Sequence, residues 1–144
     1  MTFVTSSVTR EQYTGPAYRG DMRTMQAHLL YVDDEEDLRS LVKSQLSLAG
    51  YAVDTAADGD EAVELLNRCQ FDLVLLDIYM PGMNGLMVLQ YIRDHGLCPH
   101  SIMLSEINDV AMAKRCALLG ASACVSKPYD LGVLVRSISR ALAN

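Results

Sequence analysis

The sequence has a deficit of positive charge and no long apolar run, and each absence argues against a class of partner. Lysine and arginine number 12 against 18 acidic residues, so the net charge of −6 gives little support for binding nucleic acid. No apolar run approaches the length needed to span a bilayer. The first residues also lack the basic start and the apolar segment of a secretory signal peptide. We therefore expect a cytoplasmic protein that contacts neither membrane nor nucleic acid directly.

The four cysteines show no motif of their own. Cys69, Cys98, Cys116 and Cys124 form no CxxC pair, and no histidine stands at a zinc-like spacing from them. Reduced thiols are the simplest interpretation, and they agree with a cytoplasmic location.

The chain divides into two parts of different character. Its 144 residues, half of them apolar, suffice for one domain with a sizeable core. Residues 1–27 are rich in serine and threonine and show no sustained apolar period. We expect a flexible N-terminal extension there, with a docking segment as the alternative. Residues 28–144 show a regular pattern and are expected to form the folded domain.

Short apolar runs alternate with helical patterns throughout residues 28–144. Such alternation, with short connections, predicts a parallel sheet that carries helices on both faces. The expected strands are residues 28–32, 51–55, 71–76, 101–104 and 121–126. One expected helix stops at Gly50, and the others cover residues 58–69, 85–95, about 108–119 and 130–142.

Polar side chains stand just beyond four of these strands. They are Asp33, Asp34, Asp77, Ser105 and Lys127. The carboxyl ends of parallel strands share one edge of the sheet, where open α/β folds place their sites, so these side chains should converge. Each alone reads as a helix cap or a solvated charge, but capping explains the joint placement poorly.

A cluster of three carboxylates suggests a cation. Carboxylates held close together repel one another unless a positive charge neutralises them. Because every candidate ligand is an oxygen, Mg²⁺ fits better than zinc. The site suits phosphoryl transfer, with Asp77 as the nucleophile, Lys127 as a second positive charge and Ser105 as a hydrogen-bond donor.

Four segments carry a more specific pattern: LYVDDE at 30–35, VLLDIYMPGMNG at 74–85, MLS at 103–105 and SKP at 126–128. In order and separation they resemble the receiver domain of two-component response regulators, over about residues 28–142. The resemblance implies a doubly wound, flavodoxin-like α/β fold. In it, five helices surround a five-stranded parallel sheet of order 2-1-3-4-5.

The resemblance also implies a role for each carboxylate. Asp77 accepts a phosphoryl group from a phosphohistidine on a histidine kinase or a histidine phosphotransfer protein. Asp34, Asp77 and the backbone carbonyl of Tyr79 bind Mg²⁺, and Asp33 orients the ion through water.

Two further residues complete the implied switch. Lys127 pairs with Asp77 and then with the phosphoryl group, and the hydroxyl of Ser105 moves toward that group. The fourth helix and fifth strand rearrange with it, so the face formed by the fourth helix, the fifth strand and the fifth helix should bind a downstream protein. The peptide bond between Lys127 and Pro128 is often cis in receivers.

The sequence departs from the family pattern at three positions. Cys124 stands where receivers commonly carry an aromatic side chain that reports activation, so coupling to the output face is expected to differ. Glu106 follows the switch hydroxyl where a small residue is usual, and it either faces the site and repels the phosphoryl group or points to solvent. Tyr79 is bulky at a position that gates the hydrolytic water.

The leading hypothesis is a single-domain response regulator that is not an ordinary enzyme. It would signal by phosphorylation-dependent protein binding or pass the phosphoryl group along a phosphorelay. One alternative is a receiver truncated from a larger regulator with an output domain. A second is a pseudo-receiver that acts as a constitutive interaction module. A metal-dependent hydrolase is disfavoured, because Tyr79 stands where an aspartyl phosphatase would place its acid/base aspartate.

Overall fold

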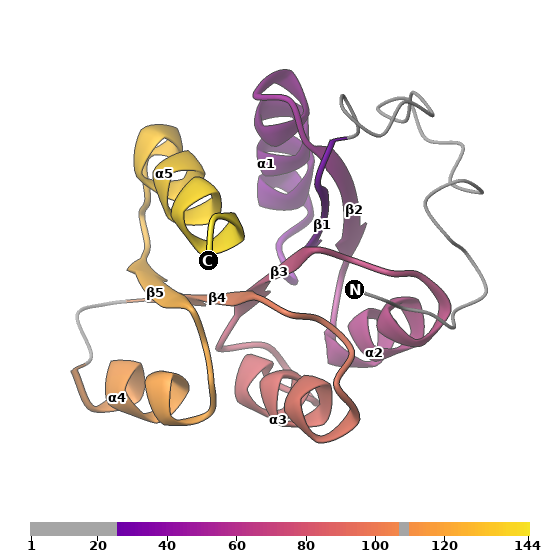
Figure 1. Ribbon diagram of the computed structural model, residues 1–144, viewed down its shortest axis with the longest axis vertical. Coiled ribbons are helices and arrows are strands. Elements are labelled where there is room, and N and C mark those ends of the chain that lie inside the picture. Colours follow the sequence, from indigo (N-terminus) through magenta and orange to yellow (C-terminus); the bar gives the residue numbers. More distant parts are fainter. Residues whose placement is uncertain (1–25, 107–109) are drawn as a thin grey trace.

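The computed structural model describes residues 26–106 and 110–144, in which five strands alternate with five helices (Figure 1). The strands are β1 (His28–Val32), β2 (Ala52–Ala56), β3 (Leu73–Asp77), β4 (Ser101–Ser105) and β5 (Ala123–Ser126). The helices are α1 (Glu36–Leu48), α2 (Gly59–Arg68), α3 (Gly85–His95), α4 (Val110–Leu118) and α5 (Leu131–Leu142). None of these helices combines the length and the apolar character that a membrane crossing needs.

The strands form one sheet in the order β2-β1-β3-β4-β5, and every neighbouring pair is parallel. The order confirms the doubly wound, flavodoxin-like fold. Because all five strands point the same way, their carboxyl ends lie along a single edge of the sheet.

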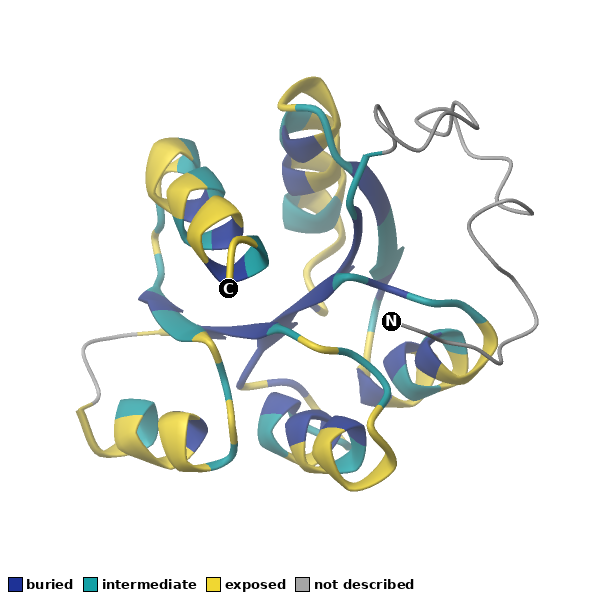
Figure 2. Ribbon diagram, viewed as in Figure 1, coloured by how far each residue is buried: buried dark blue, intermediate teal, exposed yellow. Residues whose placement is uncertain are grey.

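Helices cover both faces of the sheet. Helices α1 and α5 lie on one face, and α2, α3 and α4 lie on the other (Figure 1). Side chains alternate along each strand, so Leu29 and Tyr31 of β1 pack toward α1 and α5, whereas Leu30 and Val32 pack toward the opposite helices. Strands β1, β3 and β4 are buried along their whole length, as two-sided coverage requires (Figure 2).

Three helices begin with a side-chain cap. The side-chain oxygens of Asp58, Asn84 and Asp130 accept hydrogen bonds from the backbone N–H groups three residues onward, at the starts of α2, α3 and α5. These bonds satisfy donors that a helix leaves unpaired at its first turn. Asp130, the first residue of the helix expected over 130–142, is the cap of α5, while residues 107–109 ahead of α4 lie outside the described residues.

Small differences separate the expected and observed elements. Strand β3 begins at Leu73 rather than at 71, and β5 begins at Ala123 rather than at 121. The backbone N–H of Ala121 donates to the carbonyl of Cys116, so that residue closes the turn that follows α4. Leu41, which fits the helical repeat of α1, is 53% exposed. Of residues 1–27, only 26 and 27 are described, so the flexible extension remains a prediction.

His28 secures the opposite edge of the sheet and has a structural role. Its buried ring places Nε2 at 2.9 Å from Asp54 Oδ2 and Nδ1 at 3.1 Å from the carbonyl oxygen of Gln70. The ring also lies 4.4 Å from that of Phe71, between centroids. These contacts tie β1 to β2 and to the start of β3, far from the carboxyl edge.

Candidate functional site

The carboxyl edge of the sheet brings the expected polar residues together. Asp33 directly follows β1, Asp77 is the last residue of β3, and Ser105 is the last residue of β4. Lys127 directly follows β5, and its backbone N–H donates to the carbonyl of Ser105 over 2.6 Å. Strand register therefore assembles side chains that are distant in sequence.

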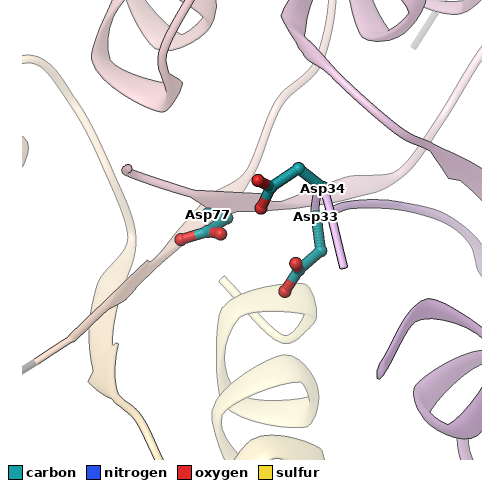
Figure 3. Close-up of side chains that lie close together, drawn as sticks. All are labelled: Asp33, Asp34 and Asp77. Atoms are coloured by element: carbon teal, nitrogen blue, oxygen red, sulfur yellow. The ribbon is translucent and has the colours of Figure 1, made fainter. Parts of the chain in front are cut away.

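Asp33, Asp34 and Asp77 form a compact carboxylate cluster (Figure 3). One oxygen from each side chain lies within 4.8 Å of the other two. Asp33 and Asp77 are buried, whereas Asp34 is exposed. The cluster is thus open to solvent at Asp34.

Lys127 bridges the two buried carboxylates. Its Nζ lies 3.1 Å from Asp33 Oδ2 and 3.2 Å from Asp77 Oδ2. Burial works against the ammonium charge, but the carboxylates of Asp77 and Asp33 outweigh it and raise the pKa of Lys127. The lysine therefore stays charged between the two buried carboxylates.

One ammonium does not neutralise this cluster fully. Burial raises the pKa of Asp77 to about 6, an effect that Lys127 reduces and the charge of Asp33 increases. The Oδ1 atom of Asp77 is buried and accepts no hydrogen bond from the part of the chain that the structure describes. A buried carboxylate oxygen without a donor is costly, so the site favours an additional positive charge.

The donor set fits a magnesium ion. The three carboxylates offer only oxygen ligands, and Mg²⁺ usually takes one or two carboxylates and keeps several waters. The exposed side at Asp34 leaves room for such waters, and the unpartnered Oδ1 of Asp77 is a ready ligand. Soft ligands that would favour zinc are missing from this cluster.

Asp33 is held by more contacts than the sequence predicts. Its Oδ1 accepts a hydrogen bond from the backbone N–H of Glu35 (2.9 Å), and its Oδ2 accepts one from the hydroxyl of Tyr31 (3.0 Å). Its backbone carbonyl accepts a hydrogen bond from Arg39 (2.8 Å), which anchors the first turn of α1. Asp33 is thus the most firmly positioned carboxylate of the cluster.

A glycine lets α3 begin beside Asp77. The backbone N–H of Gly85 donates to the carbonyl of Ile78 over 3.0 Å. A Cβ atom at position 85 would overlap the backbone carbonyl oxygen of Asp77. The loop after β3 can therefore fold back under the site only because residue 85 has no side chain.

The three atypical positions lie in different environments. The side chain of Tyr79 is half-exposed beside the site, and Glu106 is exposed. Cys124 pairs in register with Met103 and packs on the face covered by α2, α3 and α4. The interpretation in which Glu106 points to solvent is therefore the one that agrees with the structure.

Sequence reasoning did not identify Tyr31 as a site residue, and the structure pairs it with Tyr129. The hydroxyl oxygens of the two tyrosines lie 2.6 Å apart, and Tyr31 also donates to Asp33. The available signal was the two-residue period of a strand, which places Tyr31 and Asp33 on the same face. A buried tyrosine also usually needs a hydrogen-bond partner.

Comparison with curated proteins gives similarity to one part of longer regulators. The chain is 39% identical over 118 residues to the probable transcriptional regulator ycf27 of Cyanidium caldarium, which covers 80% of this chain and 47% of that protein. It is 36% identical to the transcriptional regulatory protein DltR of Streptococcus agalactiae, over 76% of this chain and 49% of that protein. The chain therefore spans about half the length of these relatives.

Comparison with solved structures supports the same assignment. The chemotaxis response regulator CheY4 of Vibrio cholerae superimposes with a TM-score of 0.75 at 29% identity, covering 81% of this chain and 99% of that one. The family model described as the response regulator receiver domain matches residues 29–139. This match includes every residue of the carboxylate cluster as well as Ser105 and Lys127. The chain belongs to the response regulator receiver family of two-component signalling.

Proposed function

We propose that Asp77 accepts a phosphoryl group from a phosphohistidine on a histidine kinase or a histidine phosphotransfer protein. A carboxylate oxygen of Asp77 would form the new bond to phosphorus as the bond between phosphorus and the histidine nitrogen breaks. The imidazole leaves with the bonding electron pair and is then protonated. The observation that carries this proposal is the bridge from Lys127 to Asp77 and Asp33 inside the carboxylate cluster.

The cluster would hold Mg²⁺ during this transfer. Asp34 and Asp77 would supply carboxylate oxygens, the backbone carbonyl of Tyr79 a third ligand, and Asp33 an outer contact through water. When bound, Mg²⁺ supplies positive charge against the phosphoryl oxygens. The unpartnered Oδ1 of Asp77 and the exposure of Asp34 support this assignment.

Lys127 and Ser105 would contact the phosphoryl group on Asp77 directly. The ammonium of Lys127 already lies 3.2 Å from Asp77, so it is placed to stabilise the negative charge of the phosphoryl group bound there. The Ser105 hydroxyl is proposed as the switch that moves toward the phosphoryl oxygens. Its place at the end of β4, bonded through its carbonyl to Lys127, supports a link between the two.

The output is proposed to be protein binding or phosphorelay, at the face made by α4, β5 and α5. The protein would act in the cytoplasm as a signalling module that assists its own phosphorylation and dephosphorylation. A second candidate is a receiver within a longer transcriptional regulator, which the partial coverage of ycf27 and DltR favours. In that form, nucleic-acid binding would belong to the output domain.

Intact mass after incubation with Mg²⁺ and acetyl phosphate tests the central step. Wild type should gain one phosphoryl group, and Asp77→Asn should gain none. If acetyl phosphate does not phosphorylate wild type, a phosphorylated histidine phosphotransfer domain is the next donor to be tried. No gain from either donor would overturn the proposal and favour a constitutive interaction module.

A further inference from the structure

Two tyrosine hydroxyls extend the carboxylate cluster toward α5. The hydroxyl of Tyr31 on β1 donates to Asp33 Oδ2 over 3.0 Å. The hydroxyl of Tyr129, two residues after Lys127, lies 2.6 Å from that of Tyr31. Both tyrosines pack in the apolar cluster beneath α1 and α5, where Tyr31 is fully buried.

The direction of this hydrogen-bond chain follows from the number of protons. A hydroxyl has one proton, and the carboxylate of Asp33 can only accept. Because Tyr31 donates its proton to Asp33, Tyr129 must be the donor in the bond between the two tyrosines. A phenol is protonated at neutral pH, so the hydrogen-bond chain runs from Tyr129 through Tyr31 to Asp33.

The hydrogen-bond chain ends on Asp33 Oδ2, the oxygen that also accepts from Lys127. Asp33 Oδ2 accepts from Tyr31 and from Lys127, while Asp33 Oδ1 accepts from the backbone N–H of Glu35. Lys127 divides its contacts between Asp33 and Asp77. Without the tyrosine hydroxyl, Asp33 Oδ2 would keep only Lys127 as a hydrogen-bond partner among the described residues, and the Asp33 carboxylate would be less firmly oriented.

We propose that Tyr31 and Tyr129 are positioning residues that fix the Asp33 carboxylate and thereby tighten Mg²⁺ binding. The proposal rests on the proposed function only in taking Asp33 to orient a bound Mg²⁺. Hydrogen-bond partners of the groups around a metal orient those groups and influence the affinity for the metal.

The same hydrogen-bond chain, from Tyr129 through Tyr31 to Asp33, connects the cation site to the start of α5. Tyr129 immediately precedes Asp130, whose side chain caps α5 through the backbone N–H of Val133 at 2.8 Å. If the hydroxyl chain strengthens Mg²⁺ binding, then Mg²⁺ binding must strengthen the chain by the same free energy. The proposal therefore links occupancy of the cation site to the junction between β5 and α5.

Isothermal titration with Mg²⁺ tests the proposal without requiring phosphorylation. Tyr31→Phe removes only the hydroxyl and should raise the Mg²⁺ Kd about tenfold. Tyr129→Phe acts through Tyr31 and should raise it roughly threefold, the loss of one ordinary hydrogen bond. Because the two hydroxyls act in series, the double variant should bind Mg²⁺ no more weakly than Tyr31→Phe alone.

Tyr51→Phe is the matched control. Tyr51 is partly buried and packs against the same apolar cluster, but it precedes β2 at the opposite edge of the sheet. Its variant should bind Mg²⁺ as wild type does. A Mg²⁺ Kd for Tyr31→Phe within about twofold of wild type would overturn the proposal, because that is less than one ordinary hydrogen bond contributes. Additive effects of the two variants would also overturn it, since a chain in series excludes them.

The result is separable from the proposed function. If wild type binds Mg²⁺ but accepts no phosphoryl group from either donor, the proposed role of Asp77 as phosphoacceptor is wrong. The comparison of Mg²⁺ affinities among the tyrosine variants would still confirm or overturn the positioning role.

Discussion

Asp77 and Lys127 face each other across 3.2 Å at the ends of β3 and β5, although 50 positions separate them in the chain. Strand β4 lies between their two strands in the sheet. The pair therefore exists only when the parallel sheet is correctly assembled. Loss of this pair should therefore affect both the stability of the fold and the chemistry of the site.

Replacing Lys127 should damage both stability and phosphorylation. Lys127→Met keeps most of the side-chain volume but leaves Asp33 and Asp77 without their shared counter-charge. Breaking a buried ion pair from one side costs on the order of 3 kcal/mol, and urea unfolding without Mg²⁺ measures it. Labelling by acetyl phosphate should slow at least about tenfold, because the phosphoryl charge loses a fixed cation.

Lys43→Met is the control for this change. Lys43 is exposed on α1, so its replacement should alter neither the unfolding free energy nor the labelling rate appreciably. Equal rates for wild type and Lys127→Met would remove Lys127 from the proposed chemistry.

Asp77→Asn should stabilise the protein when Mg²⁺ is absent. Because the pKa of Asp77 is raised to about 6 in the folded state, the folded state holds this proton more tightly than the unfolded state does. Wild type therefore loses stability as the pH rises through this window, from about 4 to about 6, relative to a chain with a neutral residue. Above pH 6, Asp77→Asn should be more stable by about 1–2 kcal/mol, and the two should converge near pH 4.

Mg²⁺ should reverse this difference. The ion stabilises only the wild-type site strongly, so saturating Mg²⁺ should raise the wild-type melting temperature more than that of Asp77→Asn. Asp94→Asn, which replaces an exposed carboxylate on α3, should show neither the pH-dependent gain nor the altered response to Mg²⁺. A constant difference between wild type and Asp77→Asn across pH 4–7 would contradict the raised pKa.

The strand ends of this protein could be predicted from its sequence with good accuracy. Apolar runs of four or five residues, each closed by a polar side chain, locate Asp33, Asp77, Ser105 and Lys127 at one edge once the sheet is known to be parallel. The periodic pattern carries this information because burial on both faces allows few polar residues within a strand.

What the sequence could not give is how these side chains share their contacts. No sequence pattern predicts that the ammonium of Lys127 contacts both Asp33 and Asp77, because these contacts depend on distances of about 3 Å across the sheet. Tyr31 reads as an ordinary core residue because its ring is buried, and the role of its hydroxyl appears only with Tyr129 beside it.

Gly85→Ala should disturb the site through the backbone. The added Cβ would overlap the carbonyl oxygen of Asp77, a backbone atom that cannot rotate away. Overpacking of this kind should cost about 2–3 kcal/mol in urea unfolding. Because Asp77 must shift to relieve the contact, the affinity for Mg²⁺ should fall as well.

Gly132→Ala provides the matched control at the start of another helix. There the nearest atom to a new Cβ is the side-chain Oδ1 of Asp130 at 3.2 Å, so only a shift of a few tenths of an ångström is needed. Alanine is the better helix former, so stability should be unchanged or slightly higher. Equal costs for the two glycine replacements would show that backbone overlap at Asp77 is not the cause.

Glu106→Ala should leave phosphorylation nearly unchanged, despite the family's usual preference for a small residue at this position. Glu106 is exposed, and water and salt weaken the effect of an exposed charge on its surroundings. The rate of labelling by acetyl phosphate should therefore change by less than about twofold, and Glu106→Lys should behave similarly. If Glu106→Ala were several-fold faster, the glutamate would have to approach the phosphoryl group during the reaction. It would then act as a brake on phosphorylation that the structure before transfer does not reveal.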